Sequence, residues 1–340
     1  MSTPPIEVLI TLPFEEALIN RLNGVSPRVR LTVIKARKPE DIPVEVWVRT
    51  EVLYTNTVLP SPDQAAQLRW IQFHWAGVDH AVQHALLQKP GLVATNLSGA
   101  SASQVAEFVV MMLLALGHHL PLLNSYQQRS EWPTSRWELL RPVELRGSTV
   151  GIIGYGSIGR QTARVLHTLG ARVLATKRDV LHPADSGFIP EGLGDLQGDL
   201  VHRLYPPQAL RSMLKECQFL AVTAPLTDQT RGMVGAAELA SLPYGACLVD
   251  TSRGGIVDHT ALVEMLTSGH LRGAALDVFP EEPLPPSSPL WKLPNVILTP
   301  HISGFSSAYD ERAVDLFAEN LNRYLANLPL YNRIDPENGY

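Results

Sequence analysis

The sequence predicts an α/β protein of two domains, with a doubly wound parallel sheet as its framework. Three observations predict this class. The chain has 340 residues, and because a domain takes about 150 residues on average, two domains are expected. Short apolar runs alternate with helical stretches along most of the chain, as they do where crossover helices join parallel strands. A glycine-rich turn, Gly154 to Gly159, stands between one such strand and the next helix.

The first hundred residues show this alternation. The expected strands are Glu7–Leu12, Val29–Ile34, Glu51–Thr55, Ile71–Phe73 and Leu92–Thr95. The expected helices among them include Glu15–Leu22 and Ser61–Leu68. One long helix, Ser103–Leu120, is expected next, and it ends before Pro121 because proline does not continue a helix.

The second half repeats the pattern. The expected strands are Thr149–Ile153, Arg172–Ala175, Phe219–Thr223, Ala246–Asp250, Gly273–Ala275 and Val296–Leu298. The expected helices are Ile158–Leu169, Ala209–Leu214, Ala236–Leu242, Thr260–Ser268 and Ser306–Leu325. Residues 180–207 contain eight Pro or Gly and four acids without a clear period, so we expect a long surface excursion there.

Composition and charge exclude several classes of protein. Hydrophobic residues make up 45% of the chain and charged residues 18%, which is ordinary globular usage. The net charge of −5 argues against nucleic-acid binding, which needs a basic surface. Cys217 and Cys247 are the only cysteines, too few for a disulfide framework or a four-ligand zinc site. We expect no metal and a reducing, cytoplasmic environment.

We also expect neither a secretory signal nor a membrane segment. The strand-like run Ile6–Ile10 has no basic segment before it. The longest apolar run, Phe108 to Gly117, has ten residues, whereas a membrane helix needs about 20.

The glycine-rich turn reads Gly154-Tyr155-Gly156-Ser157-Ile158-Gly159. In a dinucleotide-binding turn the first glycine allows the tight turn, the second admits the pyrophosphate, and the third lets helix and strand pack closely. The anion then binds the free N–H groups at the start of the helix. The alternative is a purely structural strand–helix turn.

The residues that follow the next strand indicate which dinucleotide binds. An acid that holds the adenosine ribose is usual about twenty residues after the glycines. Counting 18 residues from Gly159 reaches Lys177, followed by Arg178. These cations attract a 2′-phosphate, so NADP(H) is favoured and NAD(H) stays open. Two alternatives remain: the pair is simply solvated, or Asp179 is the ribose ligand.

Three charged residues follow the carboxyl ends of later strands. They are Arg253, Glu282 and His301. Ligands bind at that edge of a doubly wound sheet. Each residue taken alone is more often structural, but their placement after successive strands points to an active site.

Seven stretches of the chain match the sequence motifs of a known family, in the family's order: Phe73–Asp79, Val105–Glu107, Thr149–Gly159, Ala224–Gly232, Val249–Asp258, Ala275–Pro283 and Asn295–Gly304. Through them the chain resembles the D-isomer-specific 2-hydroxyacid dehydrogenases, which include glyoxylate/hydroxypyruvate reductases and phosphoglycerate dehydrogenases. Residues 1–60 match only in pattern. Lys177, Arg178 and Trp75 depart from the usual residues of the family.

The resemblance implies a discontinuous arrangement of domains. Residues 1–102, completed by 305–340, would form a flavodoxin-like substrate domain, and residues 103–304 a Rossmann dinucleotide-binding domain. It also implies a homodimer formed largely through the helix Ser103–Leu120 and the segment after it. The alternative is that this helix is simply buried within one domain.

The resemblance further implies hydride transfer between NAD(P)H and a 2-oxo acid. His301 would be the general acid, Glu282 would pair with its imidazole, and Arg253 would hold the substrate carboxylate. The implied substrate-binding residues are Trp75, Ala76, Gly77, Ser101 and Arg253. The implied cofactor-binding residues are Gly154, Tyr155, Gly156, Ser157, Ile158, Gly159, Lys177, Arg178, Pro225, Thr230, Thr251, Ser252, Asp277, His301 and Gly304.

Other activities on the same fold stay open. Formate is disfavoured, because formate dehydrogenases of the family carry Gln where this chain has Glu282. Phosphite dehydrogenases keep all three charged residues, so they remain an alternative. A dinucleotide-sensing, corepressor-like protein is an alternative from another class.

Overall fold

The chain forms two units in the computed structural model, which describes residues 4–335. Unit 1 contains the chain up to Ser101, the short piece Ser186–Phe188, and the chain from Ser306 onward. Unit 2 contains Ala102–Asp185 and Ile189–Phe305. The expected boundaries differ from these by one residue at each main junction. The assignment of Ser186–Phe188 to unit 1 was not expected.

Unit 1 is built on a parallel sheet of five strands in the order β2-β1-β3-β4-β5. Its strands are β1 (Ile6–Ile10), β2 (Val29–Val33), β3 (Val52–Thr55), β4 (Trp70–Phe73) and β5 (Val93–Thr95). Its helices are α1 (Glu16–Asn23), α2 (Val44–Arg49) and α10 (Tyr309–Leu325), with short 3₁₀ turns at Pro39–Asp41 and Ala85–Gln88. This strand order is that of flavodoxin-like folds.

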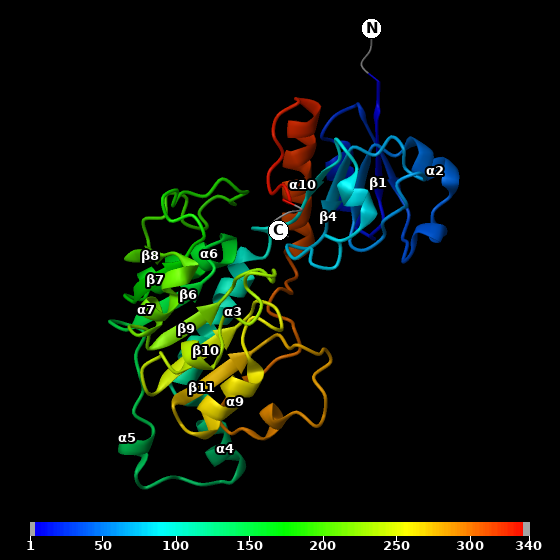
Figure 1. Ribbon diagram of the computed structural model, residues 1–340. Helices are drawn as coiled ribbons and strands as arrows, with labels where there is room; N and C mark the ends of the chain where they lie inside the picture. The colour runs from blue at the N-terminus through cyan, green and yellow to red at the C-terminus, as the bar shows by residue number, and fades with distance from the viewer. Residues whose placement is uncertain (1–3, 336–340) are drawn as a thin grey trace. The chain divides into compact units, whose positions relative to one another are not determined.

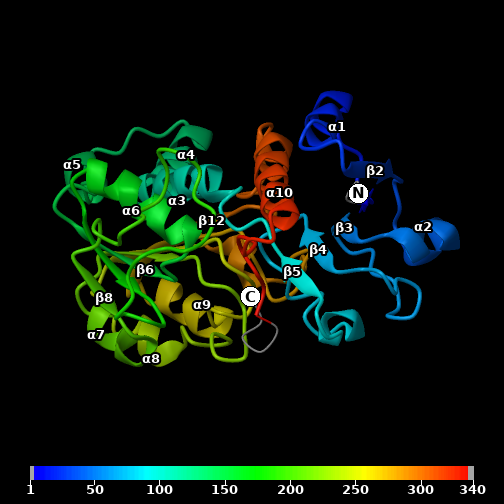
Figure 2. The same cartoon turned by 90° about the horizontal axis from the view of Figure 1, so that it is seen from above.

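Alternating residues of β1 explain why both faces of the unit 1 sheet are covered. Val8 and Ile10 point to the core shared with α10, whereas Leu9 points to the core on the other face. On the α10 side, Phe317 packs edge-on against Tyr54, with ring centroids 4.8 Å apart. Figures 1 and 2 show α10 and α2 on opposite sides of this sheet.

Unit 2 is built on a parallel sheet of seven strands in the order β12-β11-β10-β9-β6-β7-β8. Its strands are β6 (Thr149–Ile153), β7 (Arg172–Thr176), β8 (Arg203–Tyr205), β9 (Phe219–Val222), β10 (Ala246–Asp250), β11 (Leu271–Leu276) and β12 (Val296–Leu298). From β6 the chain adds strands in one direction and then, from β9, in the other. The predicted doubly wound α/β fold is therefore confirmed, and its switch point lies between β6 and β9.

The helices of unit 2 flank this sheet, except α4 and α5, which lie on an extension away from it (Figure 1). They are α3 (Ala102–Gly117), α4 (Leu120–Gln128), α5 (Arg136–Leu139), α6 (Ser157–Thr168), α7 (Leu210–Leu214), α8 (Ala236–Leu239) and α9 (His259–Thr267), with 3₁₀ turns at Pro207–Ala209 and Pro289–Lys292. Within the described residues, no single helix is long and apolar enough to cross a membrane. Only α3 and α4 taken together, bent by 63°, reach that length and composition.

The helix predicted over Ser103–Leu120 is confirmed as far as Gly117, but it ends three residues early and a second helix, α4, begins at Leu120. Helix α3 ends at Gly117, and His119 adopts a left-handed conformation with φ 59°. The carbonyl of Gly117 accepts a hydrogen bond from the N–H of Val143 (3.0 Å), and a Cβ at Gly117 would lie 2.7 Å from the Val143 carbonyl oxygen. Pro121 does not follow the helix but lies in the first turn of α4.

The helix predicted over Ser61–Leu68 is wrong. The structure forms successive turns there, in which Gln64 N–H bonds to Ser61 and Leu68 N–H bonds to Ala65, three residues back in each case. A helix would need bonds four residues back.

The excursion predicted for residues 180–207 contains a strand and is held by specific side-chain contacts. It ends in strand β8 (Arg203–Tyr205), which pairs with β7. Its residue Phe188 belongs to unit 1, where its N–H donates to Asn332 Oδ1 (3.0 Å). Asp195 is buried. Individual side-chain contacts hold this segment, and such contacts produce no regular hydrophobic period in the sequence.

Candidate active site

The candidate residues of unit 2 lie at one edge of its sheet. All pairings in this sheet are parallel, so the carboxyl ends of its strands share an edge. The glycine-rich turn follows β6, Arg253 follows β10, Glu282 follows β11 and His301 follows β12. The fold thus brings together residues that are up to 147 positions apart, His301 and Gly154 being the extremes.

The glycine-rich turn has the geometry of a pyrophosphate site. Gly154 has φ +97°, which favours glycine, and a Cβ there would lie 2.7 Å from the backbone of Ala224. A Cβ at Gly159 would lie 2.2 Å from the Gly154 carbonyl oxygen. At Gly156 a Cβ would meet nothing within 4 Å. Open space above the second glycine, at the start of α6, suits a dinucleotide pyrophosphate.

The side chain of Tyr155 is committed to contacts with Asp195 and Arg160. Tyr155 is buried and its hydroxyl donates to Asp195 Oδ2 (2.5 Å). Its backbone N–H bonds to the Thr176 carbonyl. Ser157 and Ile158 form the first residues of α6. Tyr155 therefore anchors the glycine-rich turn to Asp195.

The end of β7 supports the register used for Lys177. Ile153 pairs with Thr176, so Lys177 is the first residue beyond the strand and lies opposite the glycine-rich turn. Lys177 Nζ donates to the carbonyls of Asp179 (3.0 Å) and His182. Burial, and next the charge of Arg160, lower the pKa of Lys177.

Asp179 is occupied within its own turn. Its carboxylate accepts the N–H groups of Leu181 (3.1 Å) and His182 (3.3 Å) and pairs with the imidazole Nδ1 of His182 (2.7 Å). The hydrogen bond from the His182 ring is the largest influence that lowers the pKa of Asp179. These bonds argue against Asp179 as the ribose ligand.

His301 and Glu282 form a hydrogen-bonded pair. Nδ1 of His301 lies 2.8 Å from Glu282 Oε2, and Glu282 Oε1 accepts the N–H of Phe279 (2.9 Å). A carboxylate only accepts, so the pair places a hydrogen on Nδ1 and leaves Nε2 as the second ring nitrogen. Both side chains are solvent-accessible, as a group that meets a substrate must be.

Asp277 holds the loop that carries His301. Asp277 is fully buried; its Oδ1 accepts from Thr299 Oγ1 (2.7 Å) and the N–H of Ile302 (2.9 Å), and its Oδ2 accepts the N–H of Ser303 (2.9 Å). His301 has φ 54°, a left-handed conformation that is costly for histidine and persists where surrounding contacts enforce it. The family resemblance implies a cofactor contact for Asp277, and in the structure its carboxylate binds this loop.

The loops that carry Arg253 and Glu282 are packed together. A Cβ at Gly254 would lie 1.9 Å from the Phe279 carbonyl oxygen, so only glycine fits there. Arg253 is half-buried, and its Nη1 donates to the Ser252 carbonyl (2.9 Å). The Gly254–Phe279 contact fixes the guanidinium-bearing loop beside the loop of the His301–Glu282 pair.

Asp250 shapes the turn before Arg253. Its Oδ1 accepts the N–H of Ser252 (3.0 Å) and also the Ser252 hydroxyl, whereas Oδ2 has no hydrogen-bond partner among the described residues. Burial, with a smaller contribution from the charge of Asp277, raises the pKa of Asp250 to about 7. The sequence did not predict that Asp250 shapes this turn or that Gly254 packs against Phe279. The available signal was an acid, Asp250, and a glycine pair, Gly254 and Gly255, on either side of Arg253.

The remaining expected cofactor residues lie at the same edge. Thr230 Oγ1 donates to the Pro225 carbonyl (2.6 Å) in the segment after β9. Thr251 and Ser252 are buried directly after β10. The Gly304 carbonyl accepts from Gln104 Nε2 (2.6 Å) in the segment after β12.

The expected substrate residues of unit 1 lie at the carboxyl edge of that unit's own sheet. Trp75, Ala76 and Gly77 follow β4, and Ser101 ends the segment after β5. The two segments are joined, since the Trp75 carbonyl accepts the N–H of Leu97 (3.2 Å).

Trp75 is held by aromatic neighbours. Its ring packs against His74 and Tyr309, with centroids 4.7 Å and 5.2 Å away. Tyr54 hydroxyl lies 2.8 Å from His74 Nδ1, and burial lowers the pKa of His74 to about 4. The imidazole is therefore neutral near pH 7 and acts as packing beneath the 75–77 turn.

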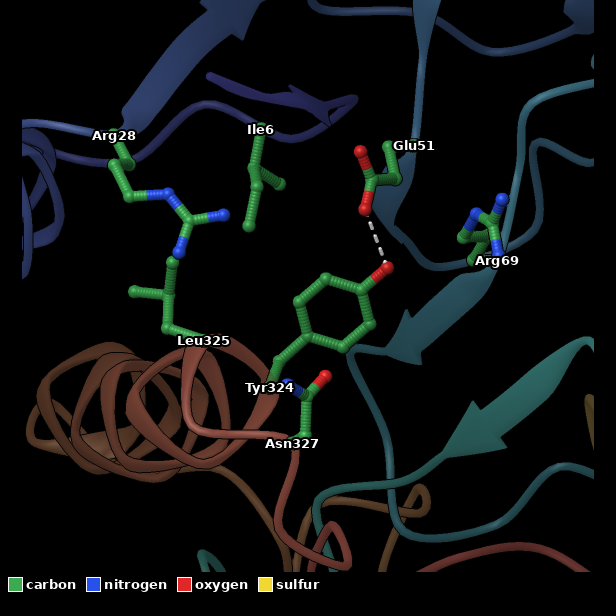
Figure 3. Close-up of a pocket in the computed structure, with 7 residues that line it drawn as sticks. All are labelled: Ile6, Arg28, Glu51, Arg69, Tyr324, Leu325 and Asn327. Atoms are coloured by element: carbon green, nitrogen blue, oxygen red, sulfur yellow. Dashed lines mark hydrogen bonds between the residues drawn. The ribbon is translucent and has the colours of Figure 1, made fainter. Parts of the chain in front are cut away.

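A pocket of about 370 Å³ lies at the other, amino edge of the unit 1 sheet (Figure 3). Arg28, Glu51 and Arg69 directly precede β2, β3 and β4, and Tyr324 at the end of α10 donates to Glu51 (2.6 Å). Because residues 75–77 follow the opposite end of β4, this pocket is separate from the candidate substrate residues.

Among residues 4–335, no three His, Cys, Asp or Glu side chains are grouped so as to hold a metal ion. Cys217 and Cys247 are free and buried, and burial raises the pKa of each thiol to about 12.

Comparisons with known proteins agree with this geometry. Residues 110–303 match the family described as D-isomer specific 2-hydroxyacid dehydrogenase, NAD binding domain. The chain is 31% identical over 325 residues to D-3-phosphoglycerate dehydrogenase of Methanocaldococcus jannaschii, an alignment that covers 94% of this chain. It spans only 57% of that relative's length.

Two solved structures cover nearly the whole chain. A D-isomer specific 2-hydroxyacid dehydrogenase from Xanthobacter autotrophicus Py2, in complex with NADPH and MES, is 27% identical with a TM-score of 0.81, covering 99% of this chain and 100% of the other. An NADPH-dependent glyoxylate/hydroxypyruvate reductase from Sinorhizobium meliloti, in complex with NADP and sulfate, is 26% identical with a TM-score of 0.76, covering 98% and 100%.

The resemblance inferred from the sequence motifs is thus confirmed, as is the use of a nicotinamide dinucleotide. The chain belongs to the D-isomer specific 2-hydroxyacid dehydrogenases, NAD(P)-dependent oxidoreductases that act on a CH–OH group and transfer a hydride between the dinucleotide and a 2-oxo acid.

Proposed function

We propose that this protein is an NADPH-preferring reductase of small 2-oxo acids of the glyoxylate/hydroxypyruvate type, forming D-2-hydroxy acids. The observation that supports it most is the His301–Glu282 pair, 2.8 Å apart, at the sheet edge that also carries Arg253 and the glycine-rich turn. A protein that only sensed the dinucleotide would have no use for this pair.

The roles of the three residues follow from their chemistry. When bound, the dinucleotide supplies the hydride for the carbonyl carbon of the acid. Glu282 holds Nδ1 of His301, so Nε2 delivers the proton to the carbonyl oxygen. The planar guanidinium of Arg253 binds the substrate carboxylate and polarises the carbonyl. Hydride and proton together convert the 2-oxo acid into the 2-hydroxy acid.

For unit 1, we propose Trp75, Ala76, Gly77 and Ser101 as the substrate-binding residues. Support comes from their position at the carboxyl edge of a flavodoxin-like sheet, where ligands of such folds bind. The indole of Trp75, held by His74 and Tyr309, takes space that a larger substrate side chain would need. This favours small acids.

For the cofactor, we propose a preference for NADP(H). The first residues beyond β7 are Lys177 and Arg178, and the nearby carboxylate of Asp179 is bound within its own turn. Two solved relatives are complexes with NADPH or NADP. One charge-assisted bond to a 2′-phosphate is worth about 1.5–3 kcal/mol, so the expected preference is about ten- to a hundredfold.

For assembly, we propose a homodimer formed through α3, α4 and α5, in a cytoplasmic setting that keeps both thiols reduced. Apolar side chains are exposed on this part of unit 2: Met111, Leu114, Leu120, Leu123, Trp132, Trp137 and Leu139. Trp132 is 82% exposed and Trp137 75%. Such a patch is typical of an interface with another protein chain.

Initial rates of dinucleotide oxidation, followed at 340 nm, test this function. Glyoxylate, hydroxypyruvate, pyruvate and a branched 2-oxo acid are each compared with NADPH and with NADH. We expect glyoxylate and hydroxypyruvate to be turned over fastest, and NADPH to support higher rates than NADH. Dinucleotide binding without turnover of any acid would favour a sensor, and a preference for the branched acid would contradict the role of Trp75.

A further inference from the structure

Arg160 is the least expected charged residue in unit 2. It follows Gly159 directly in α6, and it is only 1% exposed. Its Nη1 donates to the Asp195 carbonyl (2.6 Å), its Nη2 donates to the Pro183 carbonyl (2.5 Å), and its Nε lies 3.3 Å from Asp185 Oδ2. Its guanidinium also stacks 4.7 Å from the ring centroid of Tyr155. A buried guanidinium with this many partners is committed to the segment around residues 183–195.

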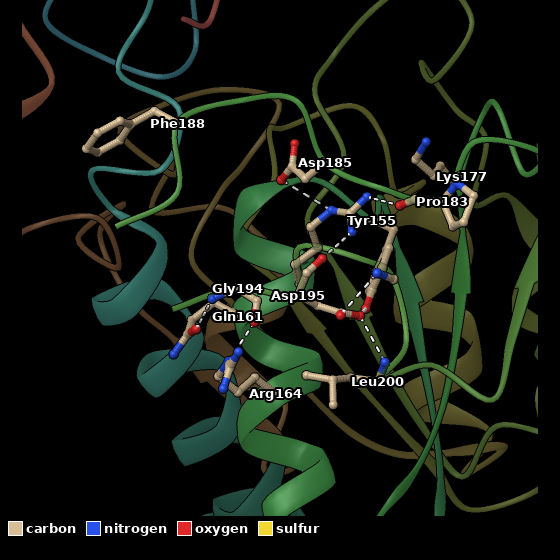
Figure 4. A network of polar contacts seen from close by, with 12 residues as sticks. Tyr155, Gln161, Arg164, Lys177, Pro183, Asp185, Phe188, Gly194, Asp195 and Leu200 are labelled. Atoms are coloured by element: carbon tan, nitrogen blue, oxygen red, sulfur yellow. Dashed lines mark hydrogen bonds and ion pairs between the residues drawn. The ribbon is translucent and has the colours of Figure 1, made fainter. Parts of the chain in front are cut away.

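Two further α6 side chains hold the same segment. Gln161 Oε1 accepts the N–H of Gly194 (2.7 Å), and Arg164 Nε donates to the Gly194 carbonyl (2.6 Å). Figure 4 shows Tyr155, Gln161 and Arg164 directed toward the segment that contains Pro183, Asp185 and Asp195. Residues 183–185 and 194–195 are therefore held against the helix that begins at the glycine-rich turn. We call this set of contacts the α6 clamp.

Asp195 completes the α6 clamp. Its carboxylate accepts the N–H groups of Gly198 (3.1 Å), Asp199 (3.0 Å) and Leu200 (3.0 Å), and it also accepts the hydroxyl of Tyr155. One buried side chain thus links the glycine-rich turn to the chain that leads into β8.

The α6 clamp adjoins the turn that follows β7. Pro183, whose carbonyl Arg160 holds, is the residue after His182, and the His182 carbonyl accepts from Lys177 Nζ. A second bond from the same ammonium goes to Asp179. Two of the three donors of Lys177 therefore close the turn of residues 177–182, and this turn carries Arg178 at the place where the 2′-position of an adenosine ribose is expected.

We propose that Arg160 is a positioning residue for the adenosine end of the cofactor: it fixes the 177–182 turn through the α6 clamp, and the shape of that turn sets the preference for a 2′-phosphate. The proposal rests on the proposed preference for NADP(H). Donors held in place before binding give more affinity than donors that must be ordered on binding. A 2′-phosphate draws on those donors, whereas an unphosphorylated ribose does not.

Two small ligands isolate this effect. 2′,5′-ADP and 5′-AMP share adenosine and a 5′-phosphate, and only the first carries a 2′-phosphate. Their dissociation constants are measured by calorimetry on the full-length wild type and on Arg160→Met. We expect 2′,5′-ADP to bind about tenfold more weakly to the variant, equivalent to about 1.4 kcal/mol, with 5′-AMP unchanged. The ratio of kcat/KM for NADPH over NADH falls by the same factor.

A second variant covers the risk that Arg160→Met folds poorly. Asp185→Asn keeps the size of the side chain, which is partly exposed, and removes only the charge paired with Arg160. It is expected to lower the same ratio in the same direction by a smaller factor. The control is Arg172→Met, which removes a partly exposed arginine that pairs with Glu216 (2.7 Å), and it leaves the ratio unchanged.

The outcomes separate the two proposals. A wild type that binds 2′,5′-ADP no better than 5′-AMP overturns the preference for NADP(H), and the role of Arg160 with it. A wild type with the preference, combined with variants that retain it, overturns only the role of Arg160. Equal weakening of both ligands would also overturn it, because that is the result of a purely structural defect.

Discussion

Replacement of Asp250 by asparagine is expected to remove a pH-dependent loss of stability. Asp250 is 1% exposed, and its Oδ2 has no hydrogen-bond partner among the described residues. Burial raises its pKa from 3.8 to about 7. Asparagine keeps an oxygen for the Ser252 donors and has no charge to bury.

The size of the effect follows from the two pKa values. Between pH 4 and pH 7 the unfolded chain releases this proton while the folded chain keeps it, so the free energy of unfolding falls as pH rises. A shift of about 3 units at 1.36 kcal/mol each amounts to about 4 kcal/mol in total. Stability from this group is fully present below pH 4 and is lost once the pH passes 7.

Chemical unfolding at pH 5 and pH 8 measures the difference. The free-energy advantage of Asp250→Asn over the wild type, in the transition that unfolds unit 2, should grow by about 3 kcal/mol between these two values. The matched control, Asp228→Asn, changes an exposed carboxylate in the same unit and should follow the wild type. An advantage of equal size at both pH values would refute the reasoning.

The other predictions concern catalysis and assembly. His301→Ala removes the proton donor, so kcat should fall by about 10²–10⁴-fold with dinucleotide affinity retained; wild-type turnover at pH 7 would contradict this role. Arg253→Lys loses the planar grip on a carboxylate, and kcat/KM for the acid should fall by about 10- to 100-fold, measured by steady-state kinetics; collapse of dinucleotide binding with an unchanged KM for the acid would oppose it. Charged substitutions at Trp132 and Trp137 should convert a particle of twice 37.4 kDa into one of 37.4 kDa by light scattering, and a wild type already at the lower mass would exclude the dimer.

Local patterns in the sequence were enough to predict most strands and the glycine-rich turn. Buried parallel strands read as short apolar runs because both faces of the sheet are covered, and β10 and β12 lie at the predicted residues. The roles of Gly154 and Gly159 also follow from sequence, because a tight turn and a close helix–strand contact require residues without a Cβ.

The carboxyl ends of α6, α7, α9 and α10 lie within one residue of the prediction, whereas the end of α3 was predicted less well because a contact with a distant residue decides it. The break after α3 depends on the bond between the Gly117 carbonyl and Val143, 26 residues further along the chain. Residues 103–120 contain no pattern that predicts this contact. The sequence around His119 also does not predict its left-handed conformation.

The sequence by itself determined the fold class, the family motifs and the residue types that carry the chemistry, since these depend on short-range periodicity and on the order of motifs. Only the tertiary structure decided which role each acidic side chain has. Asp277 and Asp250 both end or follow apolar strands, yet Asp277 binds the His301 loop, whereas Asp250 is buried with an oxygen that has no hydrogen-bond partner among residues 4–335. Likewise, nothing in the sequence distinguishes Arg160 from other helical arginines. The fold brings the carboxylate of Asp185 and the carbonyl of Asp195 to its guanidinium. Hydrogen bonds between distant side chains and backbone leave no periodic trace in a sequence, because their geometry exists only once the chain has folded.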